Sequence, residues 1–331
     1  LARCMTEAQA AFGDGTVYAE QFLDGARHIE VQIVGDGSGE VVHLWERDCS
    51  IQRRHQKLIE IAPAHGLPDA LRKRLLEAAE RLAREVRYCS LGTFEFLVDV
   101  SGDAFYFIEA NPRLQVEHTV TEAVLGLDLV SIQLAIADGA TLADVGLDPQ
   151  RIDEQRPRPR GVAVQLRINA ETMNDDGSAR ASGGTVAHFE PAQGAGVRVD
   201  SAVTTGDRLN PAFDSLLAKL IVHSNGPSNE TALRRAARLA AEFRVEGVQT
   251  NLGFLRAVLS HEDVLAGRAH TRFVDEHASA LVSQAQAFST SHLSYASTMT
   301  ATSAPDVPCA PPGSIAVAAP MPGSVVSVEV A

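Results

Sequence analysis

A strand-turn-strand segment, residues 28–50, limits the possible folds more than any other part of the sequence. In HIEVQIVGDGSGEVVHLWERDCS, Ile29, Val31 and Ile33 alternate with polar residues, and this period predicts a strand with one buried face. The glycine-rich stretch GDGSGE follows that strand and precedes another strand, whereas a phosphate-binding glycine loop opens a helix. The segment therefore favours an antiparallel hairpin over a dinucleotide-binding or P-loop motif.

Helices and further strands are expected on both sides of this hairpin. Strands are predicted over 16–23 and in a second hairpin over 92–111, and one long, largely buried helix over 119–139, ended by Gly139. A helix over 68–88, started by Pro68 and Asp69, presents one apolar stripe of Leu71, Leu75, Leu82 and Val86. The first residues also recur at helical spacing, namely Leu1, Met5, Ala8 and Phe12. A chain that opens inside a helix is expected to be cut from a longer one.

The character of the sequence changes beyond QRPRPR, a stiff connector at residues 155–160. Short strands and two helices follow it, with strands predicted over 161–170, 184–191, 196–200 and 214–223 and helices over 230–245 and 251–261. Residues 283 to 313 have the Ser, Thr, Ala and Pro content of a linker, and residues 315–331 read as two strands around a Pro-Gly turn. The whole pattern predicts an α+β protein.

Composition excludes several classes of function. Among the 331 residues, 29 are Lys or Arg and 42 are Asp or Glu, and a net charge of −13 argues against a nucleic-acid partner. The four cysteines lie far apart, so they indicate neither a zinc site nor a disulfide framework, and free thiols suit a cytoplasmic location. No apolar run approaches the length that crosses a bilayer, and no signal peptide is recognisable, so no membrane association is expected.

In IEANPRLQVEH, residues 108–118, polar residues occupy every odd-numbered position from 109 to 117 and so share one parity. In an extended segment, Leu114 and Val116 would point to one face and five polar side chains to the other: Glu109, Asn111, Arg113, Gln115 and Glu117. Glu95, in the preceding strand of the same hairpin, has the same parity and could stand beside Glu109 across the ladder. The alternative is a surface ladder of ion pairs on a hairpin, which spacing alone leaves open.

Two adjacent carboxylates repel each other unless a cation lies between them. Oxygen ligands of this kind suit Mg²⁺, which commonly takes one or two carboxylates and substrate phosphates, so a nucleotide is the expected co-ligand. Arg113 offers a planar fork for an oxyanion, Gln115 adds a neutral donor, and Glu117 stands where a general base would serve a substrate that they hold.

Basic residues precede the next strand in ERDCSIQRRHQK. Gln52, His55 and Lys57 lie in this basic segment, which could neutralise phosphate oxygens that bridge to the same metal, although such a segment alone is also compatible with a solvated basic loop. In the strand over 161–170, an inward apolar face leaves Gln165 and Arg167 on the other side. Arg167 could pair with a neighbouring carboxylate or stabilise an anion that develops in a reaction. Together these clusters predict a Mg-nucleotide site.

With these motifs in order, the sequence resembles biotin carboxylase, the ATP-grasp component of biotin-dependent carboxylases. The resemblance covers about residues 15 to 280 and rests on four stretches: HIEVQIVGDGSGEVVHLWERDCSIQRRHQKLIEIAPA, GTFEFLVDVSGDAFYFIEANPRLQVEHTVTE, GVAVQLRINAE and FDSLLAKLIVH. It implies a partial ATP-grasp domain at 1–140, a biotin carboxylase C-terminal domain at 155–283, a flexible linker at 284–313, and the first strands of a β-sandwich biotinyl (lipoyl-like) domain at 314–331.

The resemblance also implies how a nucleotide and its metal would be held. Glu95 and Glu109 would bind Mg²⁺ or Mn²⁺, with Asn111 close to the metal and the phosphates. Residues expected around ATP are Glu20 and Leu23 at the adenine, and His28, Gln52 and His55 along the ribose and phosphates.

The remaining candidates would act on bicarbonate and biotin. Lys57, Arg113, Gln115 and the backbone N–H of Val116 would hold bicarbonate. Glu117 would deprotonate it for attack on the γ-phosphate, giving carboxyphosphate, and Arg167 would stabilise the enolate of biotin. Because the N-terminal domain and the glycine-rich lid of the family precede the part matched here, the 331 residues alone are expected to bind ATP poorly and to be inactive.

Partners also follow from the resemblance. The tail AAPMPGSVVSVEVA is similar to the start of a biotinyl carrier domain, whose biotin-bearing Lys is not in this chain. Expected partners are that carrier domain, a carboxyltransferase and a second copy of the chain. The short linker leaves no room for the extra domain of some propionyl-type carboxylases. An acetyl- or propionyl-CoA carboxylase α chain, as used in fatty acid biosynthesis, or a longer chain with the carboxyltransferase downstream, is therefore favoured over pyruvate or urea carboxylase.

Two other functions stay open at this point. One is another bicarbonate-activating ATP-grasp ligase of the carbamoyl-phosphate type, against which the carrier-like tail argues. The other is a non-catalytic assembly subunit, against which the joint presence of metal, base and enolate residues argues.

Overall fold

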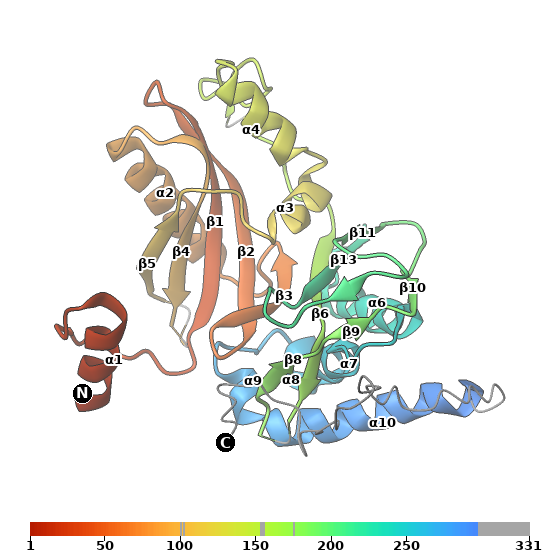
Figure 1. Ribbon diagram of the computed structural model, residues 1–331. Helices are drawn as coiled ribbons and strands as arrows, with labels where there is room; N and C mark the ends of the chain where they lie inside the picture. Colours follow the sequence, from red (N-terminus) through yellow and green to blue (C-terminus); the bar gives the residue numbers. More distant parts are fainter. Residues whose placement is uncertain (100, 102, 153–155, 175, 297–331) are drawn as a thin grey trace, which may run out of the picture. The chain divides into compact units, whose positions relative to one another are not determined.

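The computed structural model describes residues 1–99, 101, 103–152, 156–174 and 176–296, with side chains to residue 288 (Figure 1). The two strands predicted over 315–331 and most of the predicted linker therefore lie outside the described residues. The described chain combines helices with antiparallel strands, in agreement with the predicted α+β class.

An eight-stranded antiparallel sheet forms the centre of residues 1–289, in the order β11-β13-β6-β3-β2-β1-β4-β5. Its strands are β1 Arg27–Asp36, β2 Val41–Arg53, β3 Gln56–Ala62, β4 Cys89–Val98, β5 Phe105–Asn111, β6 Val162–Asn169, β11 Val197–Ser201 and β13 Leu216–Ser224. The β1–β2 and β4–β5 hairpins confirm the two predicted hairpins, and GDGSGE is the turn of the first. Three short two-stranded sheets, β7–β8, β9–β12 and β10–β14, also form in the second half of the chain. Their strands are β7 Glu171–Met173, β8 Ala179–Ala181, β9 Gly184–Thr185, β10 His188–Glu190, β12 Arg208–Leu209 and β14 Arg244–Glu246.

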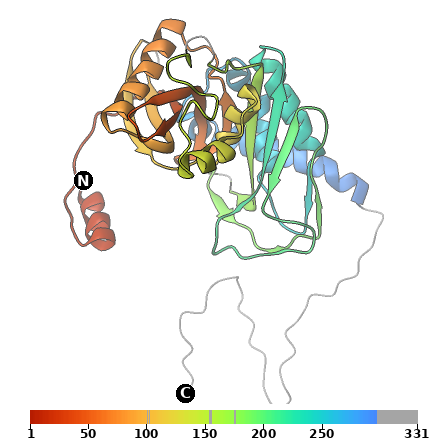
Figure 2. The same cartoon turned by 90° about the horizontal axis from the view of Figure 1, so that it is seen from above.

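Helices cover the sheet in two separate groups. α2 (Asp69–Glu85) packs on β1 and β2, and α6 (Asn229–Glu242) packs on β6 and β13, as the view from above also shows (Figure 2). α7 (Leu252–Ser260) lies against α6. The alternation predicted for β1 is confirmed, because Ile29, Val31 and Ile33 are buried in the core under α2 while the intervening polar residues face the other side.

The long helix predicted over 119–139 is wrong. Two helices, α3 (His118–Leu125) and α4 (Leu129–Ala137), meet at a bend of 102°. Gly126 lies between them with φ 68°, a left-handed conformation that ends α3, and Asp128 then caps α4. In the described residues no single helix is both long and apolar enough to cross a membrane; only this bent pair reaches the necessary length and composition.

Two further expectations need correction, and a third is confirmed. Residues 16–23 form no strand but an irregular segment before β1. In α2, Leu71 and Leu75 are buried, whereas Leu82 and Val86 are 38% and 68% exposed, because the buried face turns instead toward Leu76 and Ala79. The helix α1 (Ala2–Phe12) is present, but none of its residues is buried, so its apolar stripe faces outward.

The first residues assigned to the linker are helical. The short helices α8 (Glu262–Leu265) and α9 (Phe273–Glu276) lead into α10 (Ala278–Ala296), which occupies the first residues assigned to the linker. Leu281, Val282 and Ala285 of α10 are buried in the core shared by β6, β13, α6 and α7. This burial stabilises a helix where composition alone indicated a flexible chain.

Candidate active site

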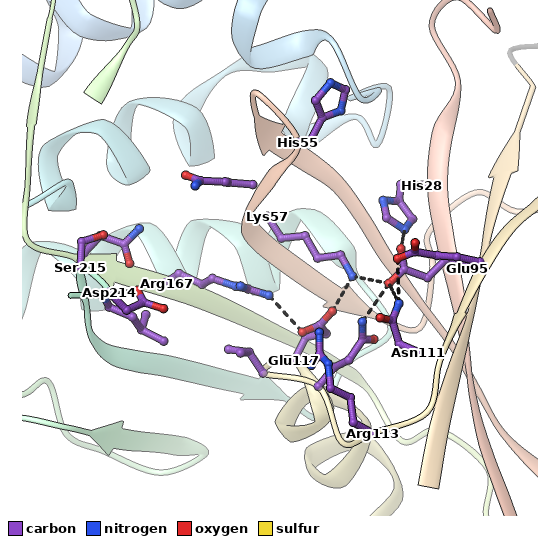
Figure 3. Close-up of a pocket in the computed structure, with 16 residues that line it drawn as sticks. His28, His55, Lys57, Glu95, Asn111, Arg113, Glu117, Arg167, Asp214 and Ser215 are labelled. Carbon is purple, nitrogen blue, oxygen red and sulfur yellow. Dashed lines mark hydrogen bonds and ion pairs between the residues drawn. The ribbon is translucent and has the colours of Figure 1, made fainter. Parts of the chain in front are cut away.

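A cavity of about 390 Å³ opens on the polar side of the sheet (Figure 3). Its lining comes from β1, the β2–β3 turn and the start of β3, the β4–β5 hairpin and the segment after it, β6, and the start of β13 with the two residues before it. Most of the predicted site residues line it: His28, His55, Lys57, Glu95, Glu109, Asn111, Arg113, Gln115, Val116, Glu117 and Arg167. The structure therefore brings together the acidic and basic clusters that the sequence presented separately.

Three carboxylates stand in a row across neighbouring strands. Glu30 on β1 is the Cα partner of Glu95 on β4, and Glu95 is the partner of Glu109 on β5. The pairing of Glu95 with Glu109 confirms the prediction from parity. Asn111 donates to both of these carboxylates, at 3.0 and 2.9 Å.

Glu95 is held by donors on several sides. Gln115 Nε2 donates to its Oε1 at 2.8 Å, and His28 Nε2 lies 2.7 Å from its Oε2. Burial disfavours the carboxylate, but the contact with His28 and the charge of Lys57 outweigh it and lower the pKa of Glu95 to about 2. Glu95 is therefore an ionised ligand at neutral pH.

Lys57 fills the space among three carboxylates. Its Nζ lies 2.6 Å from Glu30, 3.1 Å from Glu95 and 2.6 Å from Glu117. Burial disfavours the ammonium, yet the surrounding anions raise the pKa of Lys57. Burial raises the pKa of the neighbouring Cys49 thiol well above its ordinary value, so this thiol stays neutral. The raised pKa of Lys57 is therefore due to the three carboxylates.

Glu117 links this cluster to the second half of the molecule. Its carboxylate lies 2.6 Å from Lys57 and 3.0 Å from Arg167 Nη2, and its side chain is almost fully buried. Arg167 also donates from Nε to Glu60 Oε1 at 2.5 Å. Burial opposes the charge of Arg167, but Glu60 and Glu117 raise its pKa, so the guanidinium stays charged.

The segment after β5 reaches the cavity by a different route from the one predicted. β5 ends at Asn111, and a turn carries the chain into α3, which begins at His118. Arg113 and Gln115 still face the cavity, but Val116, which parity placed on the opposite face, lines it as well. An extended strand would alternate faces, whereas this turn brings consecutive residues to one side. The role of the Val116 backbone N–H in holding bicarbonate stays a prediction.

Two groups of residues at the cavity differ in exposure. Glu30 belongs to the first group although it does not itself line the cavity, because it contacts Lys57. We call Glu30, Glu95, Lys57, Glu117 and Arg167 the floor, and His55, Glu109 and Arg113 the rim. The floor carboxylates are buried and joined by ion pairs, whereas the three rim residues are exposed. Among the described residues, the guanidinium of Arg113 makes one hydrogen bond, to the carbonyl of Leu114 at 3.3 Å, so most of its donors are available to an anion.

Three predicted nucleotide contacts do not line the cavity. Glu20 and Leu23 lie in the irregular segment before β1, and Gln52 is buried in β2 opposite Lys57 of β3. Their proposed contacts with adenine, ribose and phosphates stay predictions.

Glu30 and Glu60 were missed by the sequence reasoning. Glu30 accepts from Arg47, which is itself fully buried, and from Lys57. Burial opposes its charge, but Arg47 and Lys57 lower the pKa of Glu30 to about 2. A signal was available: His28, Glu30 and Gln32 alternate with the apolar residues of β1 and so share one face. Glu60 left no such signal, since it stands between apolar neighbours in LIEIA.

The donor set fits a divalent cation beside a phosphate. Glu95 and Glu109 supply two carboxylates on adjacent strands, the exposed Glu109 faces the cavity, and Asn111 bridges them. Mg²⁺ and Mn²⁺ prefer such oxygen ligands. The place among Glu30, Glu95 and Glu117 does not suit a metal, because the ammonium of Lys57 fills it. Gln115 Oε1 is buried and has no hydrogen-bond partner among the described residues, which leaves an acceptor for a ligand that carries a proton.

Comparisons with known proteins match the two halves of the chain to two sequence families. Residues 1–145 match the family described as carbamoyl-phosphate synthase L chain, ATP binding domain, and residues 165–276 match the biotin carboxylase C-terminal domain. The first description names the carbamoyl-phosphate type of ligase considered above, and the second names biotin carboxylase.

Similar proteins agree with these families. The chain is 47% identical over 276 residues to human mitochondrial pyruvate carboxylase, covering 83% of the chain and 23% of that protein's length. Among solved structures, the biotin carboxylase domain of a single-chain bacterial carboxylase is 52% identical, with a TM-score of 0.75, over 86% of this chain and 62% of that one. A single-chain, multi-domain long-chain acyl-CoA carboxylase is 47% identical, with a TM-score of 0.74, over 80% and 27%.

The chain thus spans less than a quarter of the length of the human relative. These names do not confirm the preference for an acetyl- or propionyl-CoA carboxylase, since pyruvate carboxylase, which that preference ranked lower, is among the relatives. They confirm the resemblance at the level of the domains: the chain belongs to the biotin carboxylase family, with an ATP-grasp domain followed by a biotin carboxylase C-terminal domain.

Proposed function

We propose that this chain provides the site at which bicarbonate is activated by ATP and its carboxyl group is passed to biotin. The observation that carries the proposal is the position of Glu117. Its carboxylate contacts Lys57 and Arg167 at once and faces the cavity beside Arg113 and Gln115. A base between two cations, next to the exposed guanidinium of Arg113, suits the deprotonation of a small anion.

Bicarbonate binds against the cationic side of the cavity. Arg113, Lys57 and the amide of Gln115 hold its oxygens, with the backbone of Val116 beside them, and Gln115 Oε1 can accept from its hydroxyl group. Glu117 removes the proton of that hydroxyl group. The freed oxygen forms a bond to the γ-phosphorus of ATP while the bond from that phosphorus to the leaving ADP oxygen breaks, giving carboxyphosphate.

The metal and the nucleotide lie on the other side of the carboxylate row. Glu95, Glu109 and Asn111 would hold Mg²⁺ or Mn²⁺, which when bound neutralises charge on the transferring phosphate. His28 and His55 line the same end of the cavity, where phosphate oxygens would be nearest. Carboxyphosphate hydrolyses readily, so its formation deep among buried residues limits the access of water.

Biotin, when bound, supplies the ureido nitrogen that accepts the carboxyl group. Carboxyphosphate breaks at its C–O bond into carbon dioxide and phosphate, and the phosphate accepts the proton of that nitrogen. Arg167 then faces the negative charge that develops on the acceptor, and Glu60, Glu117 and the strand β6 hold its guanidinium in place.

The final carboxyl acceptor is a second part of the proposal. We infer an acyl-CoA from the linker length and the carrier-like tail, and one structural relative is a long-chain acyl-CoA carboxylase. Pyruvate is the second candidate, because human pyruvate carboxylase is 47% identical. A carrier domain, a carboxyltransferase and a second copy of the chain complete the proposed assembly. Carboxyl transfer from ¹⁴C-bicarbonate to acetyl-CoA, propionyl-CoA or pyruvate by the full-length gene product distinguishes the two acceptors.

The half-reaction itself is tested by ADP release. The full-length product is given ATP, Mg²⁺, bicarbonate and free biotin, and each component is omitted in turn. Release that requires both bicarbonate and biotin supports the proposal. Release that requires ammonia and is indifferent to biotin would favour a carbamoyl-phosphate ligase, and no release in any mixture would favour an assembly subunit.

A further inference from the structure

A second cluster of metal-binding side chains lies outside the cavity just described. His261, Asp263 and His277 each offer one ligand atom, and the three atoms lie within 4.8 Å of one another. His261 caps the N-terminus of α8, Asp263 belongs to its first turn, and His277 follows α9. None of them lines the catalytic cavity. We propose that this cluster is a binding site for a zinc ion.

Both histidines are held in the tautomer that a metal requires. Nδ1 of His277 lies 2.9 Å from the carbonyl of Phe273, so it carries the proton and leaves the lone pair of Nε2 free. Nδ1 of His261 accepts from the backbone N–H of Asp263 at 3.2 Å, so its own lone pair is directed toward Asp263 and the proton is on Nε2. A metal ion takes the place of that single hydrogen bond.

The third ligand is also held in position. Oδ1 of Asp263 binds the guanidinium of Arg268, at 2.6 and 2.8 Å, which leaves Oδ2 for a metal. Oδ2 lies 3.7 Å from Nδ1 of His261. Bonds of about 2.1 Å around a tetrahedral zinc ion separate two ligand atoms by about 3.4 Å, so this pair needs only a small movement.

Packing around Phe273 fixes the two imidazole rings. The ring of His277 stacks on Phe273 with centroids 4.7 Å apart, and His261 meets the same ring edge-on at 4.8 Å. Phe273 is buried in the core. The side chains of His261 and Asp263 remain 21% and 29% exposed, so a water molecule can complete the coordination. Two imidazoles and one carboxylate suit Zn²⁺ far better than Mg²⁺ or Ca²⁺.

The test is zinc binding by the untagged chain, measured by competition with a chromophoric chelator in excess Mg²⁺, which saturates the catalytic carboxylates. His277→Gln removes one ligand. His261→Asn removes another but keeps a side chain that caps α8. Each variant is expected to weaken zinc binding by more than about tenfold, since even the loss of an outer-shell partner costs that much. His188→Gln, at an exposed histidine outside the cluster, is the matched control and should bind as the parent does.

Cobalt gives an independent readout of geometry. The Co²⁺-loaded chain should show the intense visible absorption of a tetrahedral ion, and His277→Gln should lose it while its unfolding temperature without metal stays close to that of the parent. Zinc affinity unchanged in both variants, or no zinc binding by the parent chain, would overturn the proposal.

Discussion

The floor and the rim of the cavity both contain glutamate and arginine side chains, but the glutamates of the floor are buried in ion pairs and the side chains of the rim are exposed. On the floor, Glu30 is fully buried and its charge is balanced by Arg47 and Lys57. On the rim, Glu109 is exposed and accepts one hydrogen bond, from Asn111. Buried ion pairs depend strongly on each partner, whereas exposed groups keep their hydration when a partner is lost. The floor therefore combines structural and chemical roles, and the rim is free to serve ligands alone.

The largest effect is expected from Glu117→Gln in the full-length product. The amide keeps the shape of the side chain but cannot take a proton, so biotin-dependent ADP release should fall by about 10²–10⁴-fold. Binding of ATP, followed by equilibrium titration, should change little. Unchanged turnover would show that Glu117 is not the general base and that the floor has only a structural role.

Glu30→Gln and Glu109→Gln separate stability from ligand binding. The first leaves Arg47 buried without its charge partner and should lower the free energy of unfolding by about 3–5 kcal/mol. The second should leave stability within about 0.5 kcal/mol, since Glu109 is exposed, but should weaken Mg²⁺-dependent turnover. Urea unfolding measures the first effect, and a titration of turnover with Mg²⁺ measures the second. Equal stability of the two variants would contradict the distinction between floor and rim.

Acid should destabilise the floor within a defined pH range. The pKa of Glu30 is lowered from its ordinary value of 4.5 to about 2. Its contribution is therefore complete above about pH 4.5 and is lost as the pH falls toward 2, because the unfolded state binds the proton first. The free energy of unfolding, measured with a metal chelator present, should fall across this range in the parent. The fall should be smaller in Glu30→Gln, and a parallel fall in both would show that Glu30 is not its source.

The smallest effect is expected from Arg113→Ala on the rim. Loss of a hydrogen bond to a charged group costs about 1.5–3 kcal/mol, so the KM for bicarbonate should rise by about one to two orders of magnitude. The unfolding temperature should not move, because the side chain is exposed. Arg234→Ala, at an exposed pair on α6, is the control and should change neither quantity. A loss of stability without a change in KM would show that Arg113 stabilises the fold and does not bind bicarbonate.

The alternation of polar and apolar residues predicted those features that depend on neighbouring residues of the sequence. The parity of Glu95 and Glu109 predicted their pairing, because side chains alternate faces along every strand. The break at Gly126 was missed, since the apolar pattern continues through it and only the packing of α3 and α4 on separate cores shows the change of direction. Glu60 was missed because its partner Arg167 is more than a hundred residues away in the sequence.

The resemblance to a family supplied what periodicity could not. Spacing suggested a metal-nucleotide site but left a surface ladder of ion pairs open, and it gave no reason to join Arg167 to Glu117. Side-chain contacts in the structure make that connection, at 3.0 Å. Glu20 and Leu23 rest on the resemblance alone, whereas Gln52 was also predicted from its segment, and these three predicted site residues do not line the cavity.

The most direct test of the central claim follows oxygen from bicarbonate. The full-length product is incubated with ATP, Mg²⁺, biotin and ¹⁸O-labelled bicarbonate, and the released phosphate is analysed by mass spectrometry. Attack by a bicarbonate oxygen on the γ-phosphorus predicts one labelled oxygen in each phosphate. Phosphate without label, formed at a biotin-dependent rate, would show that water and not bicarbonate attacks ATP, and would contradict the account.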